Sequence, residues 1–413
     1  MNRTTADIIF SSIIGDAAGY TFTGMKKAHI KAIFREITGF TDPAPALKDN
    51  MQRWKKPGLY SSISVNSLLT AACTDKRGLN LKEYTKAVKN SPEVSGTESG
   101  IFRDAGEAEK NFIFRMQNGE NSEHHFNHPC SRLLPAVLPL LLIKNEKDRL
   151  ISAVNFISLF TKSSSTIACS VLLLQLIEDL IAEKDLKILK TALISAEKTK
   201  EDIISSQNRI FDSGHNPDYI LSASDSLLKL FRELNDIKDS SQYEKIICNY
   251  ADIKKTGLIT RASINLPETI LPMAVVLSDL YSDPEMIIET AVREGGASSS
   301  LTAISAALTT AHHGVQMPEI YTGSIVNKKR LSAMIDLIAE DKNRAVIISE
   351  IYAAEPGLTS KELEEHRAKT KNIPVLKEKK VKSRGEIESA LSKHVVESWT
   401  KMDKAKWKKE RNK

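Results

Sequence analysis

A hydrophobic repeat with the period of an α-helix is the feature that most limits the folds open to this chain. In residues 166–182, Ile167, Val171 and Leu174 lie on one helical stripe, and further leucines widen that stripe until only a narrow polar face remains. A helix of this composition is stable in water only when other elements cover most of its surface. The segment therefore predicts a core helix and a chain large enough to enclose it.

The same period recurs through most of the chain. Residues 301–314 repeat it with alanines between the larger residues, and small residues allow a neighbouring helix to approach closely. We find no sustained alternation of β-branched and polar residues of the kind that marks strands. The sequence therefore predicts an all-α fold, a compact multi-helix domain. Further amphipathic helices are expected at residues 7–20, 66–72, 133–142, 150–160, 186–195, 220–234, 268–280, 284–293 and 330–339.

Charge divides the chain into two parts. The net charge of +6 conceals a basic end, because residues 367–413 hold 16 Lys and Arg against six Asp and Glu, or +10, while residues 1–366 sum to −4. We expect a boundary of composition near residue 340: a helical domain over residues 1–340 and a Lys-rich, basic, partly helical C-terminal extension over residues 341–413. Such a tail suits a polyanion or an acidic protein, although a solvated tail that aids solubility is the plainer interpretation.

Cysteine usage and the lengths of apolar runs indicate a compartment. The four cysteines show no CxxC spacing, so nothing signals a zinc site or a redox pair, and unpaired thiols suit a reducing environment. The longest unbroken apolar runs are too short to span a bilayer, so no transmembrane segment is expected. These observations predict a cytoplasmic protein.

Three clusters of small residues stand out. Residues 15–19 read Gly-Asp-Ala-Ala-Gly, residues 57–64 read Pro-Gly-Leu-Tyr-Ser-Ser-Ile-Ser, and residues 294–300 read Glu-Gly-Gly-Ala-Ser-Ser-Ser. The last two open helices, where free backbone N–H groups and the helix dipole favour an anionic ligand. Serine is also a common N-cap, and from the physics alone capping is the simpler explanation. Phosphate-binding loops and the GxSxG, HExxH and GxGxxG motifs are all missing from the sequence.

The order of these clusters resembles the ADP-ribosylglycohydrolase family, which includes the dinitrogenase reductase-activating glycohydrolases, over residues 5–340. Residues 15–19 look like the family's Gly-Asp-Ala-Leu-Gly, and residues 57–64 fall where the family has Pro-Gly-x-Trp-Thr-Asp-Asp-Thr. Residues 127–135 resemble its Asn-Gly-x-x-Met-Arg-x-x-Pro segment. Residues 295–314 are similar to its Gly-Gly-Asp-Thr-Asp-Thr, followed by an alanine-rich helix that ends in glycine. The resemblance implies an all-α ADP-ribosylglycohydrolase-like fold.

The departures from the family pattern concern the metal site that the resemblance implies. In the family, the aspartates of the two Asp/Thr motifs hold a pair of Mg²⁺ ions that orient the ADP-ribose and the attacking water. Mg²⁺ is held in proteins through carboxylates or substrate phosphates. We therefore expect no cofactor, no metal ligand and no catalytic residue carried over from the family. The aspartate positions are here Ser62, Ile63, Ala297 and Ser299, and Thr23 stands where a glutamate is usual.

Match and departure together leave three hypotheses for the function. The first is a degenerate family member that binds an ADP-ribosyl or nucleotide-like ligand without hydrolysing it. The second is an active ADP-ribosyl hydrolase, cleaving N- or O-glycosidic bonds, whose compensating carboxylate would come from Glu36, Asp104 or Asp212. The third is a scaffold protein that acts through its basic tail. The ligand-binding residues expected from the resemblance are Ser61, Ser62, Ser64, Arg132, Gly295, Gly296, Ser298, Ser299 and Ser300.

Overall fold

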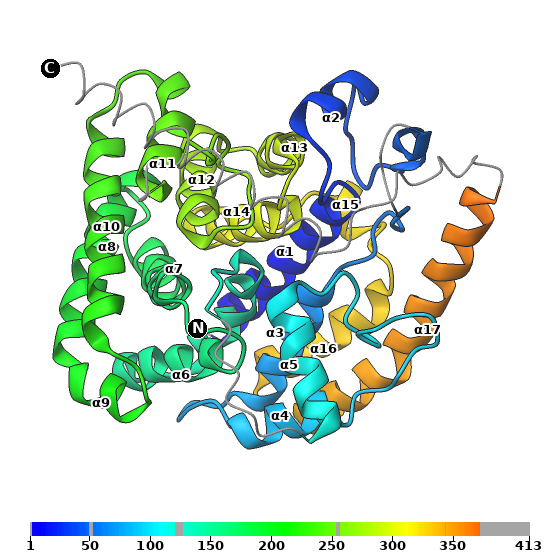
Figure 1. Ribbon diagram of the computed structural model, residues 1–413, viewed down its shortest axis with the longest axis horizontal. Coiled ribbons are helices and arrows are strands. Elements are labelled where there is room, and N and C mark those ends of the chain that lie inside the picture. The colour runs from blue at the N-terminus through cyan, green and yellow to red at the C-terminus, as the bar shows by residue number, and fades with distance from the viewer. Residues whose placement is uncertain (1, 49–52, 120–126, 253–256, 343, 372–413) are drawn as a thin grey trace, which may run out of the picture. The chain divides into compact units, whose positions relative to one another are not determined.

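The computed structural model describes residues 2–48, 53–119, 127–252, 257–342 and 344–371, and these residues fold into helices joined by short loops (Figure 1). The β pairing within those ranges is limited to isolated bridges, such as Lys26 with Gly295, so the predicted all-α fold is confirmed. The α-helices are α1 (Asn2–Tyr20), α2 (Lys27–Ile33), α3 (Ser62–Cys73), α4 (Leu81–Lys89), α5 (Glu107–Asn118), α6 (Glu146–Ser158), α7 (Ser164–Ala182), α8 (Ile188–Ser205), α9 (Gln207–Asp212), α10 (Pro217–Asp236), α11 (Tyr243–Ala251), α12 (Pro267–Leu280), α13 (Pro284–Glu294), α14 (Ser298–His313), α15 (Glu319–Thr322), α16 (Lys328–Glu340) and α17 (Arg344–Thr370). The 3₁₀ segments are η1 (Ala44–Lys48), η2 (Ser131–Leu133), η3 (Pro135–Leu142) and η4 (Ser240–Gln242).

Helices α1 and α14 form the most closely packed pair of the fold. Gly15 and Gly19 of α1 lie directly against α14, and a Cβ atom on either glycine would overlap the backbone at Thr302 or Ser298. The face of α14 is made of small residues, which is the pattern that predicted a close neighbour. Two clusters from opposite ends of the domain thereby come to lie side by side.

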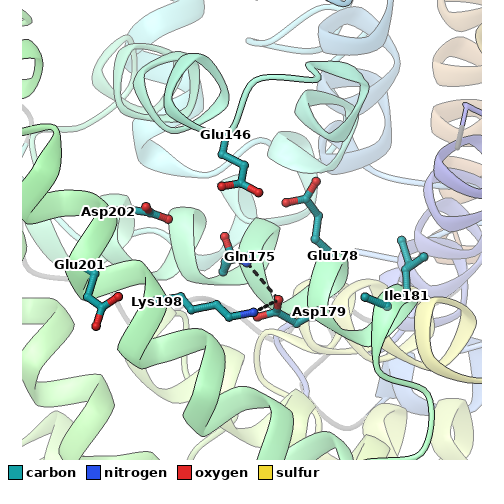
Figure 2. Close-up of a pocket in the computed structure, with 9 residues that line it drawn as sticks. Glu146, Gln175, Glu178, Asp179, Ile181, Lys198, Glu201 and Asp202 are labelled. Atoms are coloured by element: carbon teal, nitrogen blue, oxygen red, sulfur yellow. Dashed lines mark hydrogen bonds and ion pairs between the residues drawn. The ribbon is translucent and has the colours of Figure 1, made fainter.

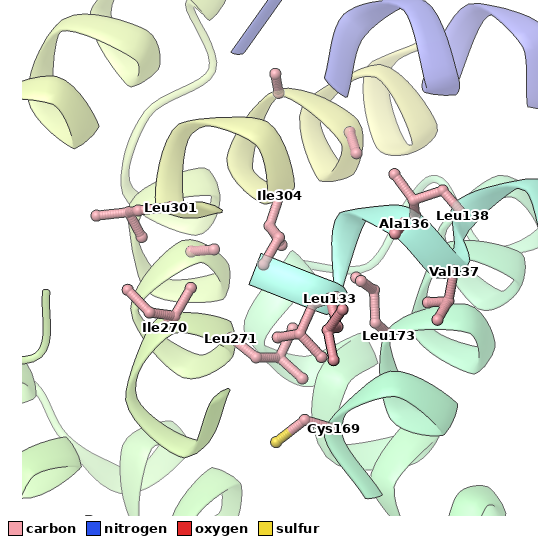
Figure 3. Packing of buried hydrophobic residues seen from close by; sticks show 14 of the residues in the cluster. Leu133, Ala136, Val137, Leu138, Cys169, Leu173, Ile270, Leu271, Leu301 and Ile304 are labelled. Atoms are coloured by element: carbon pink, nitrogen blue, oxygen red, sulfur yellow. The ribbon is translucent and has the colours of Figure 1, made fainter. Parts of the chain in front are cut away.

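The hydrophobic core continues from this pair into η2, η3, α7 and α12. Figure 3 shows Leu133 and Val137 from the 3₁₀ segments gathered with Leu173 of α7, Leu271 of α12 and Ile304 of α14, all of them buried. Among the residues that the structure describes, α7 is the one helix long and apolar enough to cross a membrane. Because 72% of its apolar window is buried inside the protein, α7 occupies the place of the predicted core helix.

Two predicted helices differ from the structure in type or by more than five residues at one end. Residues 133–142 form the 3₁₀ segments η2 and η3 rather than an amphipathic α-helix. Pro135 and Pro139 explain the difference, because proline lacks the backbone N–H and its ring clashes with the preceding helical turn. Helix α8 was expected to end near residue 195 but continues to Ser205.

The compact unit extends past the boundary expected near residue 340. It covers Met1–Thr370, because α17 packs against α3 and α16 (Figure 1). This packing is difficult to predict from the sequence, because the face that α17 buries includes the charged residues Glu355 and Glu362. Most of the basic tail predicted at residues 367–413 lies outside the described residues.

Candidate functional site

The carboxylate of Asp16 reaches from α1 to the first turn of α3. Its two oxygens accept hydrogen bonds from the Ser61 backbone N–H and hydroxyl, both at 2.8 Å, and from the Ser64 hydroxyl at 2.6 Å and N–H at 3.3 Å. Ser61 is also the N-cap of α3, with its Oγ accepting from the Ile63 N–H at 3.2 Å. Burial raises the pKa of Asp16, and the bonds from Ser64 and Ser61 oppose that rise. The helix N-terminus at this motif is therefore occupied by an internal carboxylate.

A second buried carboxylate, Glu109 of α5, accepts hydrogen bonds from two of the predicted site residues, Ser62 and Arg132. Glu109 Oε1 accepts from the Ser62 hydroxyl at 2.6 Å and from Asn66 Nδ2 at 2.8 Å. Glu109 Oε2 accepts from the Gly106 N–H at 2.7 Å and from Arg132 Nε at 2.8 Å. The same guanidinium donates to the Ser62 hydroxyl at 2.9 Å. The structure thus brings Ser62 and Arg132 together, as a consequence of a glutamate that they share.

A third carboxylate, Asp104, carries an ion pair with Lys55. The Lys55 ammonium lies 2.9 Å from Asp104 Oδ2, 3.4 Å from the Thr23 carbonyl oxygen and 4.9 Å from the centre of the Tyr20 ring. Arg132 Nη1 approaches the same Asp104 oxygen at 3.7 Å. Burial raises the pKa of Asp104, but the charges of Lys55 and Arg132 outweigh it and hold that pKa below its ordinary value. Asp104 is therefore ionised at neutral pH.

The glycines of the third cluster form the turn between α13 and α14. Gly295 and Gly296 have φ of 65° and 58°, a left-handed conformation that other residues rarely adopt. A Cβ atom on Gly295 would overlap the Met25 carbonyl, and one on Gly296 would overlap the Ser263 carbonyl. The Gly296 N–H also donates to the Met25 carbonyl at 2.8 Å. The fold itself requires both glycines.

The serines at the start of α14 meet Thr23, the residue that stands in place of the family's usual glutamate. Thr23 Oγ1 lies 2.8 Å from Ser299 Oγ and 3.2 Å from Ser298 Oγ, and the Ser299 N–H donates to it at 3.1 Å. Ser298 Oγ donates to the Gly19 carbonyl at 2.7 Å. Ser300 is buried, and its hydroxyl has no hydrogen-bond partner among the residues that the structure describes. Hydroxyls therefore satisfy one another where the family pattern has carboxylates.

Lys55 links the two halves of the site, and sequence reasoning missed it together with Asp16 and Glu109. It contacts Thr23, which holds the α14 serines, and Asp104, which lies beside Arg132. Asp16 carried a usable signal, because a carboxylate between small and apolar residues of a buried helix needs a partner. Glu109 and Lys55 carried none, since each lies in an ordinary polar stretch.

The residues present do not fit the pair of Mg²⁺ ions that the family resemblance implies. An ionised carboxylate offers about four lone-pair directions, and Asp16 and Glu109 each already accept four hydrogen bonds. Of the three compensating candidates, Asp104 lies in the site but is paired with a lysine, whereas Glu36 and Asp212 are exposed elsewhere. Across the described ranges, no group of three His, Cys, Asp or Glu side chains could hold a metal ion.

A separate cavity of about 490 Å³ lies between α6, α7 and α8 and contains none of the predicted site residues (Figure 2). Its lining is acidic. Asp179 is the carboxylate with the most partners, accepting from Lys198 at 2.6 Å, from Ser195 at 2.7 Å and from Gln175 at 3.1 Å. The acidic side chains of this lining are Glu146, Glu178, Asp179, Glu201 and Asp202.

Comparison with known proteins supports the resemblance found in the motifs. The fold is similar to that of a solved structure described as an ADP-ribosylglycohydrolase-related protein complex, with a TM-score of 0.54 and 15% sequence identity. The alignment covers 82% of this chain and 98% of that chain, and at this identity it shows the fold alone. Comparison with curated protein sequences gives no match. The family model for ADP-ribosylglycohydrolase matches residues 5–346, which include every residue of the site described above. This chain therefore belongs to the ADP-ribosylglycohydrolase family.

Proposed function

We propose that this chain is a degenerate ADP-ribosylglycohydrolase that binds an ADP-ribosyl or nucleotide-like ligand without Mg²⁺ and without cleaving it. The observation that carries the proposal is the saturation of Asp16 and Glu109 by hydroxyl, amide and guanidinium donors. Metal-assisted hydrolysis needs carboxylates with free oxygens to hold the ion that activates water. In this chain those oxygens stabilise the protein interior instead.

The cations of the site support a ligand with phosphate groups. The Arg132 guanidinium and the Lys55 ammonium both lie beside the carboxylate of Asp104. Arginine and lysine side chains are the usual partners of phosphate oxygens. The hydroxyls of Ser61, Ser62, Ser64 and Ser298 already donate within the protein, so the cations, and not these serines, would supply the donors to the ligand.

Isothermal titration calorimetry with ADP-ribose, with and without Mg²⁺, tests the proposal. We expect the same Kd in both conditions, because no step of binding uses the metal. Arg132→Lys keeps the charge but removes the guanidinium fork, and should weaken binding by about tenfold. Arg149→Lys is the matched control, since Arg149 is also buried and pairs with Glu178 away from the site. Absence of heat for the wild type in both conditions would exclude ADP-ribose as the ligand.

Asp104 favours a second candidate function, a hydrolase that works without metal. Its lowered pKa keeps the carboxylate ionised at neutral pH, the state that a general base requires. The measurement is release of ADP-ribose from arginine-linked and serine-linked substrates. The binding proposal predicts no release, whereas release that disappears in Asp104→Asn would replace it with the hydrolase.

A role of the basic tail in binding is a third candidate, supported by the charge of +10 over residues 367–413. Removal of residues 371–413 leaves α17 complete and is the appropriate deletion. With heparin as the polyanion probe, the full chain should bind in a salt-dependent manner and the deletion should not. Arg132→Lys, which changes the site, should leave heparin binding unaltered if the tail acts alone.

A further inference from the structure

Helix α17 contributes a stripe of buried polar residues to the candidate site, although all but its first three residues follow the end of the family match at residue 346. Glu355, Thr359 and Glu362 are each at most 1% exposed. Their spacing of four and three residues places them on one face of the helix. Charged side chains are almost never fully buried unless hydrogen-bond or ion-pair partners satisfy them. The partners of these residues therefore indicate the role of the helix.

Glu355 and Thr359 hold the residues that directly precede two groups of the site. Arg103 is fully buried, with Nη2 2.6 Å from Glu355 Oε2, Nη1 donating to Thr359 Oγ1 at 3.0 Å, and Nε donating to the Tyr60 carbonyl at 3.0 Å. The Tyr60 hydroxyl donates to Glu355 Oε1 at 2.6 Å. Tyr60 is followed in the chain by Ser61, and Arg103 is followed by Asp104.

A backbone hydrogen bond joins these two segments at the site itself. The Ser62 N–H donates to the Arg103 carbonyl at 2.8 Å. Asp104, the next residue, has a φ of 55°, a left-handed conformation that is uncommon outside glycine. The ion pair of Arg103 with Glu355 therefore lies directly next to the turn that carries Asp104.

Glu362 holds the segment that presents Lys55. Its Oε2 accepts from the Tyr20 hydroxyl and from Arg53 Nη2, both at 3.1 Å, and its Oε1 accepts from the Lys56 N–H at 3.0 Å. One turn later, His366 Nδ1 accepts from the Trp54 N–H at 3.1 Å. The backbone on both sides of Lys55 is thus attached to α17.

From these contacts we infer that α17 is a positioning element of the candidate site, with Glu355 and Glu362 as the positioning residues. The inference rests on the proposed binding of an ADP-ribosyl or nucleotide-like anion. Glu355 orients the turns that carry Ser61 and Asp104, and Glu362 orients the loop segment that carries Lys55. A segment outside the family match therefore sets the shape of the ligand site in this chain.

The first test compares ADP-ribose affinity in Glu355→Gln, Glu362→Gln and the milder Thr359→Val, which keeps every charge and nearly the same shape. We expect Kd to rise by about tenfold in each glutamate variant and by less in the threonine variant. Asp179→Asn is the matched control, because Asp179 is also a buried, hydrogen-bonded carboxylate but has its partners outside the site. A rise in Kd that follows the loss of thermal stability equally in all four variants would overturn the inference.

The second test needs no ligand and separates this inference from the proposed function. Hydrogen exchange on the ligand-free full chain should show faster exchange at the amides of Ser62 and Ser64 in the α17 variants, relative to amides of α14. If the wild type does not bind ADP-ribose, the proposed function fails and this local exchange alone decides whether α17 positions the site. Unchanged protection at Ser62 and Ser64 would overturn the inference even where the wild type binds.

Discussion

The candidate site and the acidic cavity both collect carboxylates, but they neutralise them differently. In the site, Asp104 faces Lys55 and Arg132, and Glu109 accepts four hydrogen bonds that include one from Arg132. In the cavity between α6, α7 and α8, five acidic side chains surround a single lining cation, Lys198 (Figure 2). The site contains fewer carboxylates, and two of them, Asp16 and Glu109, accept four hydrogen bonds each.

The pKa values of the carboxyl groups shift in opposite directions in the two regions. The pKa of Asp104 is lowered because its two cations outweigh the effect of burial. Burial raises the pKa of Glu178 and of Asp202, and the charge of Glu146 adds to both rises. The number of carboxylates in a cluster therefore does not by itself indicate how well the cluster binds a metal ion. The metal affinity depends on how many carboxylate oxygens have no hydrogen-bond donor within the protein.

Removal of the central cation of the site should produce the largest effect. Arg132→Ala leaves Glu109 buried without its charged partner, and we expect a loss of about 3–5 kcal/mol in the free energy of unfolding. Urea denaturation followed by circular dichroism measures the loss. Lys198→Ala in the cavity is the comparison, where the exposed lysine should contribute less than about 1 kcal/mol. Equal losses in the two variants would contradict the distinction between the regions.

Neutralisation of Asp104 should have an intermediate effect that depends on pH. Asp104→Asn keeps a residue that tolerates the left-handed backbone but loses the charge, at a cost of about 1–3 kcal/mol at pH 7. Because the folded pKa is lowered, the contribution of Asp104 is present above the unfolded value of about 3.9 and is lost as pH falls through the folded value. Wild type and variant should converge in stability only once the pH falls below the lowered folded pKa of Asp104, as measured by urea midpoints across the acid range. A difference that stays constant across that acid range would show that charge is not its source.

The smallest effect is expected in the acidic cavity and has the opposite sign. Asp202 has a raised pKa in the folded state, so its ionised form destabilises the fold at pH 7, and that penalty disappears as pH falls through the folded pKa. Asp202→Asn should raise stability at pH 7, by less than about 1 kcal/mol because solvent screens the half-buried group. The gain should vanish near pH 4. Scanning calorimetry at both pH values measures it, and a loss of stability at pH 7 would contradict the assignment.

The helices show which features of the fold local sequence could predict. The stripe of α7 and the small-residue face of α14 identified both as buried helices, because helical periodicity is visible without knowledge of any neighbour. The 3₁₀ geometry of η3 was not predicted, because the prediction of an α-helix relied on the apolar pattern of this segment and did not take its two prolines into account. The packing of α17 was not predicted, because Glu355 and Glu362 are residues of a type that usually lies on an exposed surface.

By itself the sequence determined that this chain is helical and similar to the ADP-ribosylglycohydrolases, and that serine, isoleucine and alanine occupy the family's aspartate positions. Those conclusions depend on periodicity and residue identity, which are local. Only the tertiary structure decided that Asp16, Glu109 and Asp104 enter the site and which donors they meet. Their partners come from helices and loops far apart in the chain, and the charge of a buried carboxylate depends on the groups that folding brings within a few ångströms of it.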